Sequence, residues 1–277
     1  MGYVEASNLF IKDAHGKKFA YREVGKKTNM PLILLTHLSA NLDNWDPKIV
    51  DGLARKFWVI AFDGQGVGLS GGSTPKKILE MANETVSFIQ ALGLNKVHIL
   101  GLSMGGMVAQ EIVLSHPKIV ERLVLVGTGP KGGQGIGRVA KVTNYSMLRA
   151  LITFKDIKYY LFFTSSQSSR TKAKEYLIRL KSRKKNRDKS IRLHSYNQQL
   201  KAIKRWSRGE TDPLEEIKQP TLIINGDTDI MVPTANSYDL AQRISDSKLI
   251  IYKDSGHGSL FQYPEEFVAD VGTFLMV

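Results

Sequence analysis

The sequence of 277 residues contains no cysteine. This absence excludes cysteine nucleophiles, disulfide frameworks and cysteine-ligated zinc, and it is consistent with a reducing compartment. No run of about 18 apolar residues could span a bilayer, and residues 1–9 lack the basic and apolar regions of a signal peptide. We therefore expect a cytoplasmic protein without a transmembrane segment.

Acidic residues are scarce relative to basic ones, since 26 Asp and Glu face 39 Lys and Arg and the formal net charge is +13. Such an excess is typical of proteins that bind nucleic acids or membrane surfaces. The excess is confined to one segment, because residues 130–212 carry +16 and the rest of the chain carries −3. The densest basic cluster lies at 179–189. The net charge of the protein therefore reflects the composition of this one segment.

Strand-like apolar runs alternate with segments of helical spacing over most of the sequence. Strands are predicted at 18–24, 32–36, 57–62, 97–100, 123–126, 220–225 and 248–252, and helices at 75–92, 104–115, 234–244 and 265–275. This alternation is typical of a parallel sheet covered on both faces. Between 130 and 212 the spacing is helical and no strand is evident, and structureless loops of this length are rare in compact domains. We predict an α/β core formed by residues 1–129 and 213–277, with a helical cap formed by residues 130–212.

The motif Gly-Leu-Ser-Met-Gly at 101–105 lies between a predicted strand and a predicted helix. Small residues are needed where the backbone turns sharply from strand to helix and lifts the Ser103 hydroxyl clear of the sheet. The N–H of Met104, at the start of the helix, can face an oxyanion. A glycine-rich turn without chemistry can have the same sequence. The strand–turn–helix context favours Ser103 as a nucleophile.

A serine nucleophile needs a base, and the base needs an acid to orient it. Among the six histidines, His257 stands out because it lies in a glycine-rich loop at 254–258, directly after a predicted strand. A histidine between glycines can be a plain turn residue, but open α/β sheets place their sites at the carboxyl ends of strands. The turn at 225–229 follows another predicted strand and offers two carboxylates, Asp227 and Asp229. Periodicity does not choose between them.

Taken together, these motifs resemble those of α/β-hydrolase fold enzymes. The resemblance covers roughly residues 3–129 and 214–277 and rests on the motifs at 101–106, 226–229 and 255–257 and on Pro233. It implies an α/β-hydrolase fold, with a mostly parallel sheet flanked by helices and a helical cap inserted after the sixth strand. In this family the acid is usually the third residue after the glycine of the turn, which is Asp229 here, and Asp227 is then structural. Within the family, the chain is similar to the esterase, lactonase and cofactor-free haloperoxidase-like branch.

The sequence departs from the family pattern at the second oxyanion donor. Relatives usually carry His-Gly-X after the third strand, whereas this chain has Thr-His-Leu-Ser at 36–39. Alignment on the preceding leucines and on Trp45 makes Leu38 the donor through its backbone N–H. Alignment on His37 nominates Ser39, which we rank second. We expect His37 to be a structural loop residue, with substrate contact as the alternative.

The resemblance implies a serine hydrolase that cleaves a small or medium carboxylic ester or lactone through an acyl-enzyme. His257 would deprotonate Ser103, Asp229 would orient His257, and the N–H groups of Leu38 and Met104 would receive the oxyanion. The reaction needs neither a metal nor a cofactor. A C–C bond or thioester hydrolase with the same triad is an alternative, and so is a small-molecule sensor of the same fold with weak hydrolase activity.

The basic cluster at 179–189 has several interpretations. We favour a solvated face of a cap helix, because exposed charge runs are common. Steering of an anionic substrate and docking to an anionic lipid surface are alternatives, and nucleic-acid binding is a further one. The partner we expect is a small ester-like substrate, anionic if the cluster steers it, and we expect no nucleic-acid partner.

Overall fold

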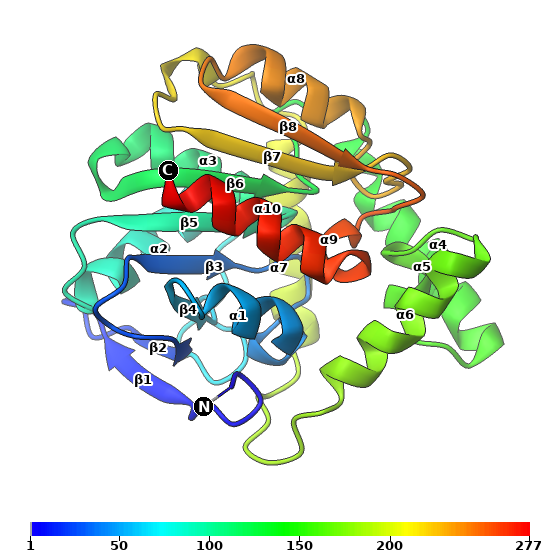
Figure 1. Cartoon of the computed structure of the whole chain (residues 1–277), viewed down its shortest axis with the longest axis horizontal. Coiled ribbons are helices and arrows are strands. Elements are labelled where there is room, and N and C mark those ends of the chain that lie inside the picture. Colours follow the sequence, from blue (N-terminus) through cyan, green and yellow to red (C-terminus); the bar gives the residue numbers. More distant parts are fainter. Residues whose placement is uncertain (1) are drawn as a thin grey trace.

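The computed structural model describes residues 2–277, and one eight-stranded sheet runs through it (Figure 1). The strand order is β1-β2-β4-β3-β5-β6-β7-β8. The strands are β1 (Leu9–Lys12), β2 (Lys18–Val24), β3 (Pro31–Leu35), β4 (Trp58–Phe62), β5 (Val97–Leu102), β6 (Val120–Val126), β7 (Thr221–Gly226) and β8 (Ser247–Tyr252).

Six of the strands are parallel to one another, from β4 through β3 and β5 to β8, while β1 and β2 continue the sheet as an antiparallel hairpin. The interior strands β3, β4 and β5 are buried along their whole length, as expected for strands covered on both faces. Because parallel strands share a direction, the loops that follow β3, β5, β7 and β8 emerge at one edge of the sheet. This edge is where an open α/β sheet places its binding site.

Helices cover both faces of the sheet. The core helices are α1 (Pro47–Leu53), α2 (Ile78–Ala91), α3 (Met104–Ser115), α8 (Ala235–Arg243), α9 (Ser259–Gln262) and α10 (Pro264–Met276), with short 3₁₀ turns at Leu42–Asn44, Pro117–Ile119 and Leu214–Glu216. Helices α1 and α10 pack together on one face, and α2 and α3 pack together on the other (Figure 1).

Every predicted core strand and helix is present, whereas three short elements, β1, α1 and the four-residue helix α9, were not predicted. Strand β1 has only four residues, half of them exposed, so it lacks the apolar run that signals a buried strand. Helix α1 has seven residues and begins at Pro47 behind the N-cap Asp46, so it is too short to show a clear helical period. The helix predicted from residue 75 begins at Ile78.

The chain between β6 and β7 is helical, which confirms a helical insertion after the sixth strand. It contains a 3₁₀ turn (Ile136–Arg138) and the helices α4 (Val139–Thr153), α5 (Lys158–Leu161), α6 (Gln167–Leu180) and α7 (Leu193–Trp206). Helices α4, α5 and α6 lie together at one end of the sheet (Figure 1). We call this insertion the cap; its division from the core at residues 130 and 212 stays a prediction.

The interpretation of the basic cluster 179–189 as a solvated helix face is wrong for two of its arginines. Helix α6 ends at Leu180, so most of the cluster lies in the segment that follows it. The Arg179 guanidinium donates to both carboxylate oxygens of the buried Asp46, at 2.7–3.0 Å. The side chain of Arg183 is 7% exposed. The cluster is therefore in part an attachment of the cap to the core.

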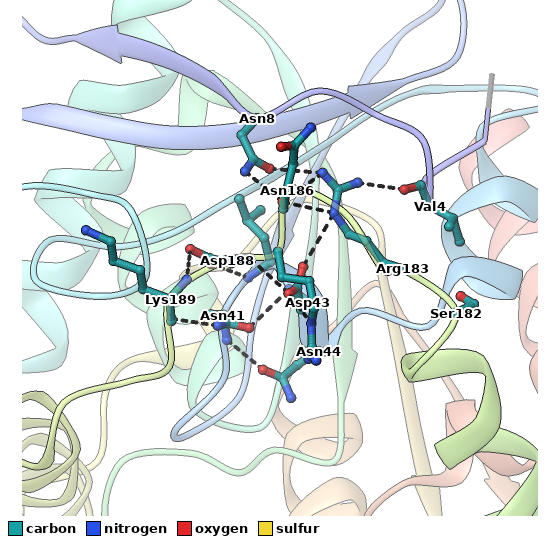
Figure 2. Close-up of polar contacts among 12 residues, drawn as sticks. Val4, Asn8, Asn41, Asp43, Asn44, Ser182, Arg183, Asn186, Asp188 and Lys189 are labelled. Atoms are coloured by element: carbon teal, nitrogen blue, oxygen red, sulfur yellow. Dashed lines mark hydrogen bonds and ion pairs between the residues drawn. The ribbon is translucent and has the colours of Figure 1, made fainter.

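Arg183 binds the segment that precedes β1. Its Nη1 donates to the carbonyls of Val4 (2.7 Å) and Ala6 (2.8 Å), while Nε and Nη2 donate to the carbonyl of Asn186 (Figure 2). Asp43 lies 3.9 Å from Arg183 Nε and is itself paired at 2.7 Å with the fully buried Arg22. Buried carbonyls and charges need such partners, and the cap supplies them here.

A pair of carboxyl groups also joins cap and core. Asp63 directly follows β4, Asp188 belongs to the cap, and the N–H of Leu42 donates to both side chains, at 3.0 and 3.2 Å. Burial and the neighbouring Asp188 raise the pKa of Asp63 well above its ordinary value. Asp63 therefore keeps its proton at a pH where an exposed aspartate has lost it.

Candidate active site

Ser103 forms the turn between β5 and α3 in a conformation that few non-glycine residues adopt, with φ 56° and ψ −115°. Its backbone N–H donates to the carbonyl of Val126 at 2.8 Å, which holds the turn against β6. A Cβ at Gly105 would lie 2.2 Å from the carbonyl oxygen of Leu35, and one at Gly101 would lie 2.4 Å from that of Gly105. The small residues of the motif are thus required by the close approach of three backbone segments.

His257 and Asp229 are in direct contact although 28 positions separate them in the sequence. His257 Nδ1 lies 2.7 Å from Asp229 Oδ2, and both side chains are buried. The other oxygen, Oδ1, accepts the N–H groups of Met231 (2.8 Å) and Val232 (3.0 Å). These bonds fix the carboxylate, and a proton held on Nδ1 by the carboxylate leaves His257 Nε2 able to accept another.

Asp227, the second acid in the same turn, does not touch His257. Its two oxygens accept the backbone N–H groups of Asp254 and Ser255, each at 3.1 Å. The side chain therefore links the loop after β7 to the loop after β8. The geometry supports Asp229 as the partner of His257 and gives Asp227 a positioning role for the histidine loop.

Two backbone N–H groups near Ser103 are available to a ligand. The N–H of Met104, the first residue of α3, has no acceptor within the helix. The N–H of Leu38 donates no hydrogen bond in the part of the chain that the structure describes. The N–H of Ser39, in contrast, donates to Gln199 Oε1 of α7 at 2.8 Å. This favours Leu38 over Ser39 as the second oxyanion donor, which stays a proposal.

Ser103 and His257 line the same cavity, of about 150 Å³, between the core and the cap. The core contributes the loop after β3, including Leu38, and the cap closes the cavity mainly with apolar side chains, among them Leu161 and Phe162. Phe162 also anchors the histidine loop, because its carbonyl accepts the N–H of Gly258 at 2.9 Å. The cap therefore forms part of the site.

His37 lies in the wall of this cavity. Its Nδ1 is 2.9 Å from the carbonyl of Leu38, and its ring meets that of Phe162 edge-on, with 5.1 Å between the ring centres. Burial, with the positive charge of Lys158 as a smaller cause, lowers the pKa of His37 to about 3. His37 is thus neutral near pH 7, and its position is compatible with both the structural role and the substrate contact considered from the sequence.

Sequence reasoning missed the residues that the cap contributes to the cavity. Thr143 of α4, Lys158 of α5 and Tyr196 of α7 all line it. They belong to no motif, and only the packing of the cap brings them to Ser103.

Within residues 2–277, no three histidine or acidic side chains are grouped as a metal site, and no helix is long and apolar enough to cross a membrane.

Comparisons with known proteins agree with this architecture. The family model for the alpha/beta hydrolase fold matches residues 31–264. A solved alpha/beta hydrolase fold protein from Chitinophaga pinensis is 33% identical, with a TM-score of 0.95 over 99% of both chains. A poly(3-hydroxyalkanoate) depolymerase of Ectopseudomonas oleovorans is 28% identical over 91% of this chain and 86% of its own length. A protein of Agrobacterium fabrum assigned as a carbamate hydrolase is 26% identical over 89% of this chain and 93% of its own. The chain belongs to the alpha/beta hydrolase fold family.

Proposed function

We propose that the protein is a serine hydrolase that cleaves a small or medium carboxylic ester or lactone through an acyl-enzyme. The observation that carries this proposal is the 2.7 Å contact between the buried Asp229 and His257, which lines the same cavity as the strained Ser103. A buried acid–base pair beside a serine at the start of a helix is the arrangement that acyl transfer requires.

The proton moves along a short path in this mechanism. His257 Nε2 takes the proton of Ser103 Oγ as the oxygen attacks the ester carbonyl. Asp229 stabilises the imidazolium that forms, and His257 then gives the proton to the departing alkoxide. In the second half of the cycle, His257 deprotonates a water molecule, which attacks the acyl-enzyme. The carboxylic acid leaves, and Ser103 regains its proton.

The tetrahedral intermediates carry a negative charge on the former carbonyl oxygen. We assign its stabilisation to the N–H groups of Leu38 and Met104, which are backbone donors and need no side-chain reorganisation during the reaction. Loss of one such donor in other hydrolases costs about 10²–10³ in kcat. Gly105 supports this arrangement, because the space above it is filled by the backbone of Leu35 and by the carbonyl oxygen of Thr36.

Relatives of this chain are named as hydrolases of different substrates, including carbamates and polyesters of hydroxy acids. One further relative, of Metapseudomonas resinovorans, is named for hydrolysis of a 2-hydroxy-6-oxo-dienoic acid. The same triad can serve each of these reactions, because all proceed by attack on an acyl carbon. Esters and lactones are our first choice, and carbamates, thioesters and C–C bonds are the alternatives that an assay must include.

Labelling with a fluorophosphonate probe tests the triad directly. The wild type should be labelled at Ser103, Ser103→Ala should not be labelled, and His257→Ala should be labelled far more slowly. Labelling of His257→Ala at the wild-type rate would contradict the mechanism. A panel of p-nitrophenyl esters of increasing chain length, with lactones, thioesters and carbamates, then identifies the bond. A labelled serine without turnover on any of them would favour a sensor of the same fold.

A further inference from the structure

Three buried polar atoms of the active-site cavity have no hydrogen-bond partner within residues 2–277. They are Nε2 of His37, Oγ1 of Thr143 and the hydroxyl of Tyr196, and all three residues line the cavity that contains Ser103. They come from separate elements, namely the loop after β3, helix α4 and helix α7. Buried polar atoms are nearly always paired, because desolvation without a partner is costly. Other unpartnered atoms occur elsewhere in the described residues, but these three belong to residues that line one cavity, so a ligand bound there is placed to supply their partners.

The chemistry of His37 defines one requirement on that ligand. Its Nδ1 donates to the carbonyl of Leu38, and the ring is neutral, so Nε2 has only a lone pair to offer. The ligand group that meets Nε2 must therefore carry a hydrogen on oxygen or nitrogen. A plain hydrocarbon chain, a ketone or a carboxylate cannot satisfy it.

The two cap hydroxyls accept a wider range of partners. Thr143 and Tyr196 can each donate or accept, and burial raises the pKa of Tyr196, so its hydroxyl keeps its proton. Valine and phenylalanine would fill nearly the same volumes without a polar atom. If the cavity bound only hydrocarbon, the two hydroxyls would be desolvated without a hydrogen-bond partner and would weaken binding.

Charge in the cavity does not by itself call for an anionic ligand. Lys158 is the cation in the wall, and Asp156 Oδ1 already lies 3.5 Å from its ammonium group. The remaining cap lining is apolar, for example Leu161 and Ile203. The cavity therefore matches a mainly apolar molecule with a neutral group that both donates and accepts hydrogen bonds.

We propose that His37, Thr143 and Tyr196 form a polar subsite that selects esters or lactones bearing a hydroxyl or a secondary amide besides the scissile bond. This inference rests on the proposed hydrolase function and deepens it by naming a substrate class. Hydroxyl and amide groups share the required chemistry, since each offers one hydrogen and one acceptor oxygen.

Matched substrates test the subsite. We would compare the p-nitrophenyl esters of 3-hydroxyhexanoic acid and hexanoic acid, and those of N-acetylglycine and pentanoic acid. Each ratio of kcat/KM is divided by the ratio of the hydroxide-catalysed rates, which removes differences in intrinsic reactivity. At least one polar ester should be preferred by about tenfold or more, the effect of one or two neutral hydrogen bonds. Whichever pair shows the preference identifies the group.

Three variants remove the subsite atoms one at a time. Thr143→Val and Tyr196→Phe delete a hydroxyl, while His37→Asn keeps an N–H for the Leu38 carbonyl and deletes the acceptor Nε2. Each should reduce the preference ratio at least threefold. Tyr145→Phe is the matched control, because Tyr145 lies on the same cap with 68% of its surface exposed, and it should keep the wild-type ratio.

The outcomes are separable from those of the proposed function. Equal normalised rates for both members of each pair in the wild type would overturn the subsite, and so would an unchanged preference in all three variants. If no ester is turned over, the hydrolase proposal fails, and the subsite is then tested separately by the binding of amide ligands to Ser103→Ala. Calorimetry should then show 3-hydroxyhexanamide binding at least threefold more tightly than hexanamide, and equal affinities would refute the subsite.

Discussion

Replacement of Arg183 by methionine should loosen the attachment of the cap to the core. Methionine keeps much of the apolar stem but removes every donor of the guanidinium. The carbonyls of Val4 and Ala6, which now accept bonds of 2.7 and 2.8 Å, would lose their partner, the first in a partly buried and the second in a buried environment. Lys185→Met is the control, because Lys185 belongs to the same basic cluster and is exposed.

The structure sets the size of the effect. Removal of one member of a buried ionic contact costs about 3–5 kcal/mol when the other charge is left unpaired. Asp43 would not be left unpaired here, because Arg22 stays 2.7 Å away. The loss is therefore the hydrogen bonds from a charged donor to buried carbonyls, at about 1.5–3 kcal/mol each and not fully additive. We expect a decrease of about 3 kcal/mol in the free energy of unfolding, a large part of the total of about 5–15 kcal/mol typical of folded domains.

Urea unfolding followed by circular dichroism measures this difference. With an m value of about 3 kcal/mol per M, the midpoint of Arg183→Met should fall by about 1 M. Lys185→Met should stay within about 0.5 kcal/mol of the wild type. Equal midpoints for the two variants would refute the reasoning, since they would mean that the contacts of Arg183 contribute no more than an exposed charge.

Three further predictions concern the site and the core. Asp229→Asn should lower kcat by a factor on the order of 10⁴, because the amide favours the wrong histidine tautomer, while Asp227→Asn should lower kcat far less. Steady-state kinetics on the best ester measures both effects, and the reverse order would assign the acid to Asp227. Gly105→Ala should destabilise the fold by about 1–3 kcal/mol or more, because its Cβ would lie 2.2 Å from a carbonyl oxygen of β3, whereas Gly64→Ala meets nothing within 4 Å and should be neutral in thermal unfolding. Asp63 has a raised pKa in the folded state, so that state holds more protons than the unfolded one above pH 3.8, and stability should fall as pH rises through the raised pKa. The melting temperature of Asp63→Asn should depend less on pH from 4 to 8 than that of the wild type, and identical pH profiles would contradict this assignment.

The core could be predicted from sequence because its local signals agree with its tertiary environment. Strands such as β3 and β4 are continuous apolar runs since both faces of the sheet are covered, and α3 begins and ends at the residues that its spacing predicts. The edge strand β1 escaped prediction for the opposite reason. It is paired on one side only and half exposed, so its sequence has no strong pattern.

Some residues of the candidate site could likewise be predicted from the sequence and others could not. Ser103 and His257 stand in loops marked by flanking glycines, where close approach of other segments leaves little room for a Cβ, so sequence alone could nominate them. The choice of Asp229 over Asp227 needed a family resemblance, since both acids occupy the same turn and only the fold directs one of them to the histidine. Thr143 and Tyr196 reach the cavity through the packing of α4 and α7, and no short-range pattern encodes that position.

Part of the basic charge behind the net charge of +13 is paired with acidic residues inside the molecule. Arg179 and Arg183 face the core, and the acids near them, Asp46 and Asp43, are core residues. The +16 of residues 130–212 and the −3 of the rest are thus partly complementary within one molecule. Buried or half-buried pairs of this kind are screened only weakly by salt, unlike contacts with a polyanion at the surface. Two arginines of the basic cluster, Arg179 and Arg183, therefore hold the cap to the core, so their charge is already compensated within the molecule and is not evidence for an external polyanionic partner.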